Sequence, residues 1–380
     1  MSGGRAAGAA SRVRFHLNRH ASRDAYRAGE ARVISLAAAT RALDELKSWP
    51  GYGPSPLHEL PDMARQLGVG SIACKDESRR FGLGSFKSLG GAYAAELALR
   101  RRSPTLAPPT LCCATDGNHG QSVAHAARRR SCRCVIFVHE HAPAAKISAM
   151  QALGAAVVRV PGNYDDSVRH AQRISAENGW LLISDTSEIE SDPAVAEVMQ
   201  GYGVMVLEIL AQWRGLALPT HVFVQAGVGG LAAAIAGCFA DLAAADRPCV
   251  VVVEPEAAAC VMQAALDGRP GSLPGDLATN MAMLSCGQVS APAWSILSTR
   301  ADAFMTVSDA QADAAAARLL HGDCAACFDR GLTPSSAAGL AGLAAAAEDA
   351  GIASMLGLEA ASRVLIFATE GGDLRPASAS

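Results

Sequence analysis

Short apolar segments alternate with helical patterns along most of the chain, and this alternation constrains the fold more than any other feature. Segments typical of strands are residues 71–75, 111–115, 134–138, 156–160, 180–183, 221–225, 249–253 and 364–368. Helical patterns lie at residues 86–102, 119–130, 144–153, 165–178, 194–214, 231–242 and 335–350. Strands that are apolar throughout need helices on both faces. The sequence therefore predicts an α/β fold with mostly parallel sheets.

The length of 380 residues suits two domains better than one. A compact strand-helix-strand unit at residues 134–160 predicts a smaller α/β domain over residues 95–190, inserted into a larger domain formed by residues 13–94 and 191–380. The first thirty or so residues are rich in Arg, Ala and Gly and hold no acid before Asp24, which faintly resembles an organelle transit peptide. A disordered tail over residues 1–12 is the preferred interpretation.

Charge and hydropathy exclude several classes of partner. The formal net charge is −3, and no basic stripe with interleaved aromatic residues occurs, so we expect no nucleic acid partner. We find no apolar run near the roughly 20 residues needed to cross a bilayer, and no signal-peptide pattern. We therefore expect a soluble, unsecreted, cytoplasmic protein with no membrane partner.

The chain has 11 cysteines, an odd number, and several of them fall in predicted buried strands. Reduced thiols in the core are the better interpretation than a disulfide framework. Cys324 and Cys327 have the spacing of metal ligands, with His321 close by. No second pair stands at zinc-site distance, so we predict no metal, and a redox role for this pair is a further alternative.

Lys87 is the first candidate for chemistry. A strand ending at Lys75 leads into a polar loop with glycines, after which Ser85 and Phe86 precede Lys87 at a helix start. The positive end of a helix dipole lowers the pKa of an ammonium and favours the neutral amine. A neutral amine can attack a carbonyl to form a Schiff base. An ordinary surface lysine is the alternative, and the other lysines compete little, because two of them look solvated: Lys47 and Lys146.

Residues 115–120 form the second candidate, a turn between a strand and a helix. Backbone N–H groups and short polar side chains that converge at such a turn make an anion site suited to a carboxylate. The residues concerned are Thr115, Asp116, Gly117, Asn118 and His119. Asp116 at the tip either caps the helix or works as an acid or base.

A glycine loop after the strand at residues 221–225 is the third candidate. Its glycines let backbone amides approach a phosphate at a helix start; the residues are Gly227, Val228, Gly229 and Gly230. The same letters fit a dinucleotide-binding motif, in which Glu254 would bind the ribose. A tight turn without a ligand is the third interpretation.

Hydroxyl groups beside two further loops could face a ring nitrogen. Thr369 follows the strand at residues 364–368. Ser335 and Ser336 begin an Ala-rich helix that lies before this strand in the sequence. Helix capping by either serine is an equally good interpretation.

The order of these motifs resembles that of the fold-type II pyridoxal-phosphate enzymes, and within them the 2,3-diaminopropionate ammonia-lyase family. The resemblance runs from about residue 12 to residue 373, through residues 75–78, 80–83, 86–87, 89–94, 115–120, 163–166, 199–202, 225–229, 253–255 and 369–371. It implies two domains, each with a mostly parallel sheet flanked by helices, a homodimer, and pyridoxal 5'-phosphate as cofactor. Serine and threonine dehydratases usually carry a small residue where this chain has Asp116.

The resemblance also implies a role for each candidate. Lys87, beside Phe86, would form the Schiff base with the cofactor, and the glycine loop would hold the cofactor phosphate. Asn118 would bond the pyridine hydroxyl, and Thr369, Ser335 or Ser336 would meet the pyridine nitrogen. The two acids on the substrate side would be Asp116 and Asp185. Thr115, Gly117 and His119, in the turn at residues 115–120, would complete the substrate site.

The implied reaction is α,β-elimination of D- or L-2,3-diaminopropionate to pyruvate and two ammonia. Lys87 would take the proton from the L enantiomer and Asp116 from the D enantiomer. An amine leaves poorly unless it is protonated, so Asp116 or Lys87 would serve as the proton donor. A cationic substrate side chain would also pair with Asp116 and Asp185.

Two departures from the family pattern concern the choice of substrate. Residues 187–193 replace an aromatic-acid-Gly-Tyr stretch, and Pro334 replaces an acid before the serines. A serine, threonine or hydroxyaspartate dehydratase is therefore the main alternative. A nicotinamide-dependent oxidoreductase would leave Lys87 and Asp116 without a role. A cofactor-binding protein without turnover would keep Lys87 and the glycine loop but would not need acid-base groups.

Overall fold

The computed structural model describes residues 13–102, 109–115, 117–162, 164–213, 217–321, 327–328 and 331–372. The strands are β1 Phe15–Leu17, β2 Leu57–Glu59, β3 Ser71–Asp76, β4 Thr110–Ala114, β5 Arg133–His139, β6 Ala156–Val160, β7 Leu181–Leu182, β8 His221–Gln225, β9 Cys249–Pro255, β10 Ala303–Val307 and β11 Arg363–Ala368. Every predicted strand is present, whereas β1, β2 and β10 were not predicted.

The helices are α1 Ala28–Val33, α2 Leu36–Lys47, α3 Pro61–Leu67, α4 Lys87–Arg100, α5 Asn118–Arg129, α6 Ala144–Ala152, α7 Tyr164–Asn178, α8 Pro193–Gln212, α9 Gly230–Ala243, α10 Cys260–Asp267, α11 Ala291–Arg300, α12 Asp309–Leu319, α13 Pro334–Glu348 and α14 Ala350–Leu356. Short 3-10 turns lie at Arg80–Gly82, Glu256–Ala258 and Ala282–Leu284. The predicted helices correspond to α4 to α9 and α13.

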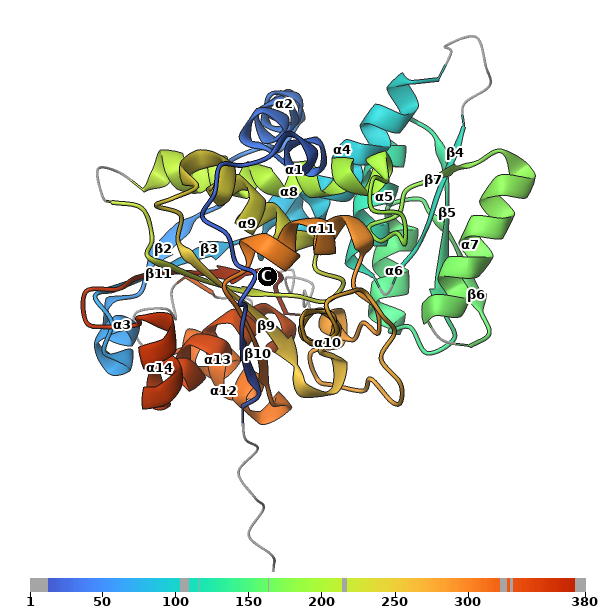
Figure 1. Cartoon of the computed structure of the whole chain (residues 1–380). Helices are drawn as coiled ribbons and strands as arrows, with labels where there is room; N and C mark the ends of the chain where they lie inside the picture. Colours follow the sequence, from blue (N-terminus) through green and yellow to red (C-terminus); the bar gives the residue numbers. More distant parts are fainter. Residues whose placement is uncertain are drawn as a thin grey trace, which may run out of the picture.

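The strands form two sheets, as the α/β prediction requires. The larger sheet has seven strands in the order β1-β10-β9-β8-β11-β3-β2, with antiparallel strands only at its edges. The smaller sheet has four parallel strands in the order β6-β5-β4-β7. Figure 1 shows the smaller sheet with α5, α6 and α7 on one side of the molecule. The strands of this sheet all lie within residues 95–190, although the domain boundaries themselves stay a prediction.

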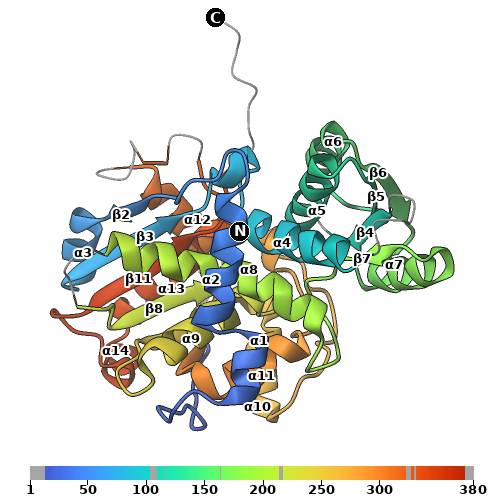
Figure 2. The ribbon, with the colours of Figure 1, turned by 90° about the horizontal axis from the view of Figure 1, so that it is seen from above.

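The helix α8 corrects one expectation from the sequence. It has 20 residues and is apolar enough to cross a bilayer, yet 72% of its most apolar stretch is buried inside the molecule. Its neighbours are α2, α4 and α9, which enclose it in the core (Figure 2). Burial within the protein explains the apolar composition of α8.

A close crossing of α4 and α8 sets the position of the first turn of α4. A Cβ atom at Gly90 would lie 2.4 Å from both the Val198 carbonyl oxygen and Tyr202 Cε1. On the other helix, a Cβ atom at Gly201 would lie 2.6 Å from Gly90 Cα. The two backbones are therefore in direct contact. Lys87, which begins α4, lies one turn before this crossing.

Gly90→Ala is expected to destabilise the protein by about 3 kcal/mol, because the new methyl group overlaps backbone that cannot move locally. Urea unfolding followed by circular dichroism measures the change. Gly29→Ala is the matched control, since Gly29 is also helical and has no atom within 4 Å of its added Cβ. A loss for Gly90→Ala within 0.5 kcal/mol of the control would contradict the close crossing.

Candidate active site

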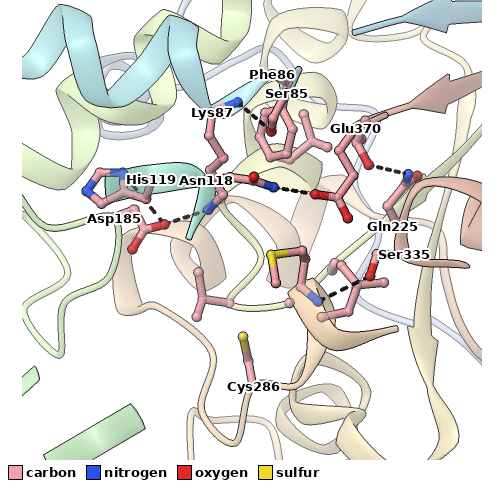
Figure 3. A pocket seen from close by; sticks show the side chains of 18 of the residues that line it. Ser85, Phe86, Lys87, Asn118, His119, Asp185, Gln225, Cys286, Ser335 and Glu370 are labelled. Atoms are coloured by element: carbon pink, nitrogen blue, oxygen red, sulfur yellow. Dashed lines mark hydrogen bonds and ion pairs between the residues drawn. The ribbon is translucent and has the colours of Figure 1, made fainter. Parts of the chain in front are cut away.

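A pocket with about 860 Å³ of empty space, part of it open to solvent, lies where the two sheets meet. The starts of α4, α5 and α9 point into it, together with the loops after β7, β8 and β11 (Figure 3). Predicted site residues line it as follows: Phe86, Lys87, Thr115, Gly117, Asn118, His119, Asp185, Gly227, Val228, Gly229, Gly230, Ser335 and Thr369. Two are not among them. Ser336 is 0% exposed and does not line the pocket. Asp116 lies outside the described residues.

Lys87 carries its charge in this pocket, contrary to the neutral amine expected from the helix dipole. Its Nζ lies 2.5 Å from Asp185 Oδ2, and Figure 3 shows the two side chains directed toward each other. Burial alone would lower the pKa of Lys87, but the Asp185 carboxylate raises it above the usual value. Burial likewise opposes the charge on Asp185, yet Lys87 holds the pKa of Asp185 well below its usual range. A contact between full charges outweighs the partial charge of a helix end.

His119 presents an unused acceptor beside this ion pair. Its Nε2 lies 2.9 Å from the Ile183 carbonyl oxygen, so Nε2 carries the proton and Nδ1 the lone pair. Nδ1 is buried, has no hydrogen-bond partner in the described part of the chain, and lies 4.0 Å from Asp185 Oδ2. Burial lowers the pKa of His119 and keeps its ring neutral. A buried acceptor without a partner indicates that a polar ligand group belongs in the pocket.

The glycine loop forms a cradle at the start of α9. Gly229 has a φ of +94°, which favours glycine, and α9 begins at the next residue. A Cβ atom at Gly227 would lie 2.9 Å from Cys286 Sγ, so the loop has no room for a side chain there. Backbone amides at a helix start are suited to an anion such as phosphate. These features fit the phosphate of a bound cofactor.

Glu254 does not support the dinucleotide alternative. It is 0% exposed, and its two carboxylate oxygens accept hydrogen bonds of 2.8 Å from the backbone N–H groups of Val261 and Met262. Burial raises the pKa of Glu254 to about 8. The residue caps α10 from inside the core and is not available to a ribose.

The hydroxyl groups differ in how they are held. Gln225 Nε2 donates to Thr369 Oγ1 over 3.0 Å, so the proton of Thr369 remains to donate into the pocket. Ser335 Oγ accepts from the backbone of Met283 over 3.1 Å, and Ser336 Oγ accepts from the backbone of Glu370 over 3.1 Å. Thr369 and Ser335 both line the pocket and stay candidates for the ring nitrogen.

Two charged residues at the site were not predicted. Asn118 Nδ2 donates to Glu370 Oε2, and Asn118 Oδ1 accepts from Lys146 Nζ over 2.8 Å. The interpretation of Lys146 as an ordinary solvated lysine is therefore wrong. Glu370 follows Thr369 directly in the sequence, so its place after a strand was a signal that could have identified it.

The remaining candidates lie away from the chemistry. Lys75 is 0% exposed and pairs with Glu208, with Nζ 2.7 Å from Oε2. Cys324 lies outside the described residues, and within the described ranges no three His, Cys, Asp or Glu residues group as metal ligands. The divergent segment at residues 187–193 borders the pocket, because Ser187 lines a second cavity that shares Cys286 and Tyr164 with the first.

Comparisons with known proteins agree with this site. The family described as pyridoxal-phosphate-dependent enzymes matches residues 48–368. Diaminopropionate ammonia-lyase of Salmonella typhimurium is 35% identical over 285 residues, which are 69% of this chain and 70% of the relative. The Escherichia coli K12 enzyme is 35% identical over 277 residues, with the same shares of the two chains.

Solved structures extend the match over the whole fold. Escherichia coli diaminopropionate ammonia-lyase, in complex with an aminoacrylate-PLP azomethine intermediate, aligns with a TM-score of 0.84 at 32% identity and covers 95% of this chain and 94% of its own. Threonine deaminase isoform 2 of Solanum lycopersicum, at 24% identity and a TM-score of 0.74, shares the fold. The chain therefore belongs to the pyridoxal-phosphate-dependent enzymes of fold type II, as an ammonia-lyase family member homologous to diaminopropionate ammonia-lyase.

Proposed function

We propose that the chain catalyses the α,β-elimination of 2,3-diaminopropionate, as the D or L enantiomer or both, to pyruvate and two ammonia. The observation that supports this substrate best is the carboxylate of Asp185, which already holds an ammonium, that of Lys87, at 2.5 Å. The Lys87 ammonium lowers the pKa of Asp185 and keeps it ionised, and a substrate ammonium in the same place would do the same when Lys87 is engaged with the cofactor. A carboxylate in that position suits the cationic side chain of diaminopropionate better than a neutral hydroxyl.

The residues present fit the cofactor. The glycine loop would hold its phosphate, Asn118 its ring hydroxyl, and Thr369 or Ser335 its ring nitrogen. Bound pyridoxal phosphate supplies an electron sink that lowers the barrier to removing the proton from Cα of an amino acid. The protein supplies the base, the orientation and the charge around that carbon.

Lys87, once released by the substrate amine, is placed to accept the Cα proton on its Nζ. Asp185, with the Nδ1 lone pair of His119 beside it, would hold the side-chain ammonium of the substrate. The C–N bond then breaks, and the electron pair leaves with the nitrogen as neutral ammonia while a C=C bond forms. The released enamine hydrolyses in water to pyruvate and the second ammonia. The part of Asp116 on the D enantiomer stays a prediction.

A dehydratase acting on serine, threonine or hydroxyaspartate is the second candidate. The Escherichia coli relative has been solved in complex with D-serine, at 30% identity to this chain. Threonine dehydratase of Arabidopsis thaliana is 32% identical over 214 residues, 55% of this chain and 33% of the relative. Such a substrate would leave the charge of Asp185 without a cationic partner.

The deciding experiment assays the purified holoenzyme with D- and L-diaminopropionate, serine, threonine and hydroxyaspartate. Ammonia and pyruvate are quantified in the same reaction. Two ammonia for each pyruvate, with the largest kcat/KM for a diaminopropionate enantiomer, is the expected result. One ammonia for each pyruvate and a preference for a hydroxy amino acid would replace the proposal with the dehydratase.

Asp185→Asn is expected to lower kcat/KM for diaminopropionate by about 100-fold, because a charge-assisted hydrogen bond to the substrate ammonium is lost. Turnover of serine, where measurable, should fall by less than tenfold. Glu177→Gln is the control, since Glu177 is an exposed acid on α7 that pairs with Arg173 and does not line the pocket. Equal losses on the amine and hydroxyl substrates would show that Asp185 does not recognise the ammonium.

We also propose a homodimer, as the family resemblance implies. Analytical ultracentrifugation of the holoenzyme should give a mass twice that of the 39.1 kDa chain.

A further inference from the structure

A chain of polar contacts crosses from the smaller sheet to the larger one at the wall of the pocket. Lys146 on α6 and Asn118 at the start of α5 lie on helices that pack against the smaller sheet, and Glu370 follows β11 of the larger sheet. Lys146 Nζ lies 2.8 Å from Asn118 Oδ1 and 3.7 Å from Glu370 Oε2, while Asn118 Nδ2 donates to the same carboxylate oxygen. Figure 3 shows the Asn118 amide directed at Glu370.

Each end of this chain is fixed independently. A Cβ atom at Gly117 would lie 2.8 Å from Lys146 Cδ, so the lysine stem runs over a residue that has no side chain to block it. Glu370 has a side chain that is 4% exposed, and its Oε1 accepts a 2.6 Å hydrogen bond from Thr333 Oγ1. The ammonium and the carboxylate are therefore held in place before any ligand binds.

These contacts determine which way the Asn118 amide faces. An ammonium can only donate, so the atom facing Lys146 is the amide oxygen, and an ionised carboxylate only accepts, so the atom facing Glu370 is the amide nitrogen. One N–H of that nitrogen is used by Glu370. The second N–H remains to donate into the pocket, which Asn118 lines. Asn118 is thus set to donate to the ring oxygen of the cofactor and not to accept from it.

We propose that Lys146 and Glu370 are positioning residues that act through Asn118 and set the ionisation of the bound cofactor. Lys146 is a cation and lowers the pKa of the bound cofactor, whereas Glu370 is an anion and raises it. Of the other groups at the pocket, Lys87 would carry the Schiff base in the holoenzyme, Asp185 lies beside it, and His119 is neutral. These groups are the same in the wild type and in every variant, so they do not account for a difference between them. Asp116 lies outside the described residues. The inference depends on the cofactor alone, and not on which substrate is consumed.

The test is a spectrophotometric pH titration of the holoenzyme, which follows the visible band of the cofactor without substrate. Lys146→Met removes a cation but keeps an apolar stem over Gly117. The pH at which half of the visible band has changed, the midpoint of the titration, should rise by about one unit. Glu370→Gln removes an anion and should lower the midpoint by a similar amount. The double variant should return toward the wild-type midpoint. Both single variants should also bind pyridoxal phosphate about tenfold more weakly, because Asn118 is no longer held.

Lys47→Met is the matched control, since Lys47 is an exposed lysine at the end of α2 and should leave the midpoint unchanged. Shifts of both single variants in the same direction, or shifts no larger than that of the control, would overturn the proposal. Lower thermal stability with an unmoved midpoint would overturn it too, since it would show a purely structural contact. Lys146→Gln replaces Lys146→Met in the same titration if the methionine variant does not fold.

Discussion

Lys87→Ala is expected to abolish elimination, with kcat reduced at least 10³-fold, and to remove the visible band that borohydride bleaches in the wild-type holoenzyme. The structure leaves no replacement among the remaining lysines. Lys75 is buried against Glu208, Lys146 is held by Asn118 and Glu370, and Lys47 is exposed on α2. The measurements are single-turnover kinetics and an absorbance spectrum of protein reconstituted with pyridoxal phosphate.

Lys87→Arg separates the chemistry of the amine from its charge. Arginine stays protonated and can pair with Asp185, but it cannot form a Schiff base. We therefore expect Lys87→Arg to be as inactive as Lys87→Ala and to have a thermal stability closer to that of the wild type. If either variant keeps more than about 1% of wild-type turnover, another group performs the reaction, and the assignment of Lys87 is wrong.

The positions of the strands were predictable because their local sequence carries the signal. Continuous apolar segments such as those of β8 and β9 can only lie in a sheet that is covered on both faces. The strand β10 was not predicted because its Ala, Phe and Met residues fit a buried helix equally well. The capping box of Ser308 and Gln311 at the start of α12 is a local signal that would have identified that helix.

The contacts within the site were less predictable, because they join residues far apart in the chain. Asp185 lies 98 residues from Lys87, and its carboxylate reverses the protonation expected from the helix dipole. Glu370 lies 252 residues from Asn118 and fixes the orientation of its amide. Motif order places these residues in one pocket only through the family resemblance. Distances and protonation states follow from the packing of the two sheets.

Behind the loop that precedes Lys87 lies a buried cluster of two cations and two carboxylates. Arg80 is 4% exposed and contacts both Glu77, at 2.7 Å, and Glu208, at 2.7 Å. Lys75 Nζ lies 2.7 Å from Glu208. The four formal charges sum to zero, so removing one cation leaves a buried charge without compensation.

Arg80→Met is expected to destabilise the protein by about 4 kcal/mol, since the apolar side chain fills the space but leaves a buried carboxylate unpaired. Arg65→Met is the control. Arg65 pairs with Asp62 on the surface of α3, where its side chain is 72% exposed, so its loss should cost less than about 1 kcal/mol. Urea unfolding at pH 7 measures both variants. Similar losses for the two would show that the buried cluster contributes no more than a surface pair.

The pH dependence of this difference tests its electrostatic origin. Burial opposes the charge of Glu208, but hydrogen bonds and charge from Arg80 lower its pKa below the usual value. A carboxyl whose pKa is lower in the folded state stabilises the fold above its unfolded pKa, and this stability is lost as the pH falls through the folded value. The difference in free energy of unfolding between wild type and Arg80→Met should therefore be largest at pH 7 and become smaller below about pH 4. A gap that stays constant from pH 7 to pH 3.5 would instead indicate that Arg80 stabilises the loop through packing of its side chain.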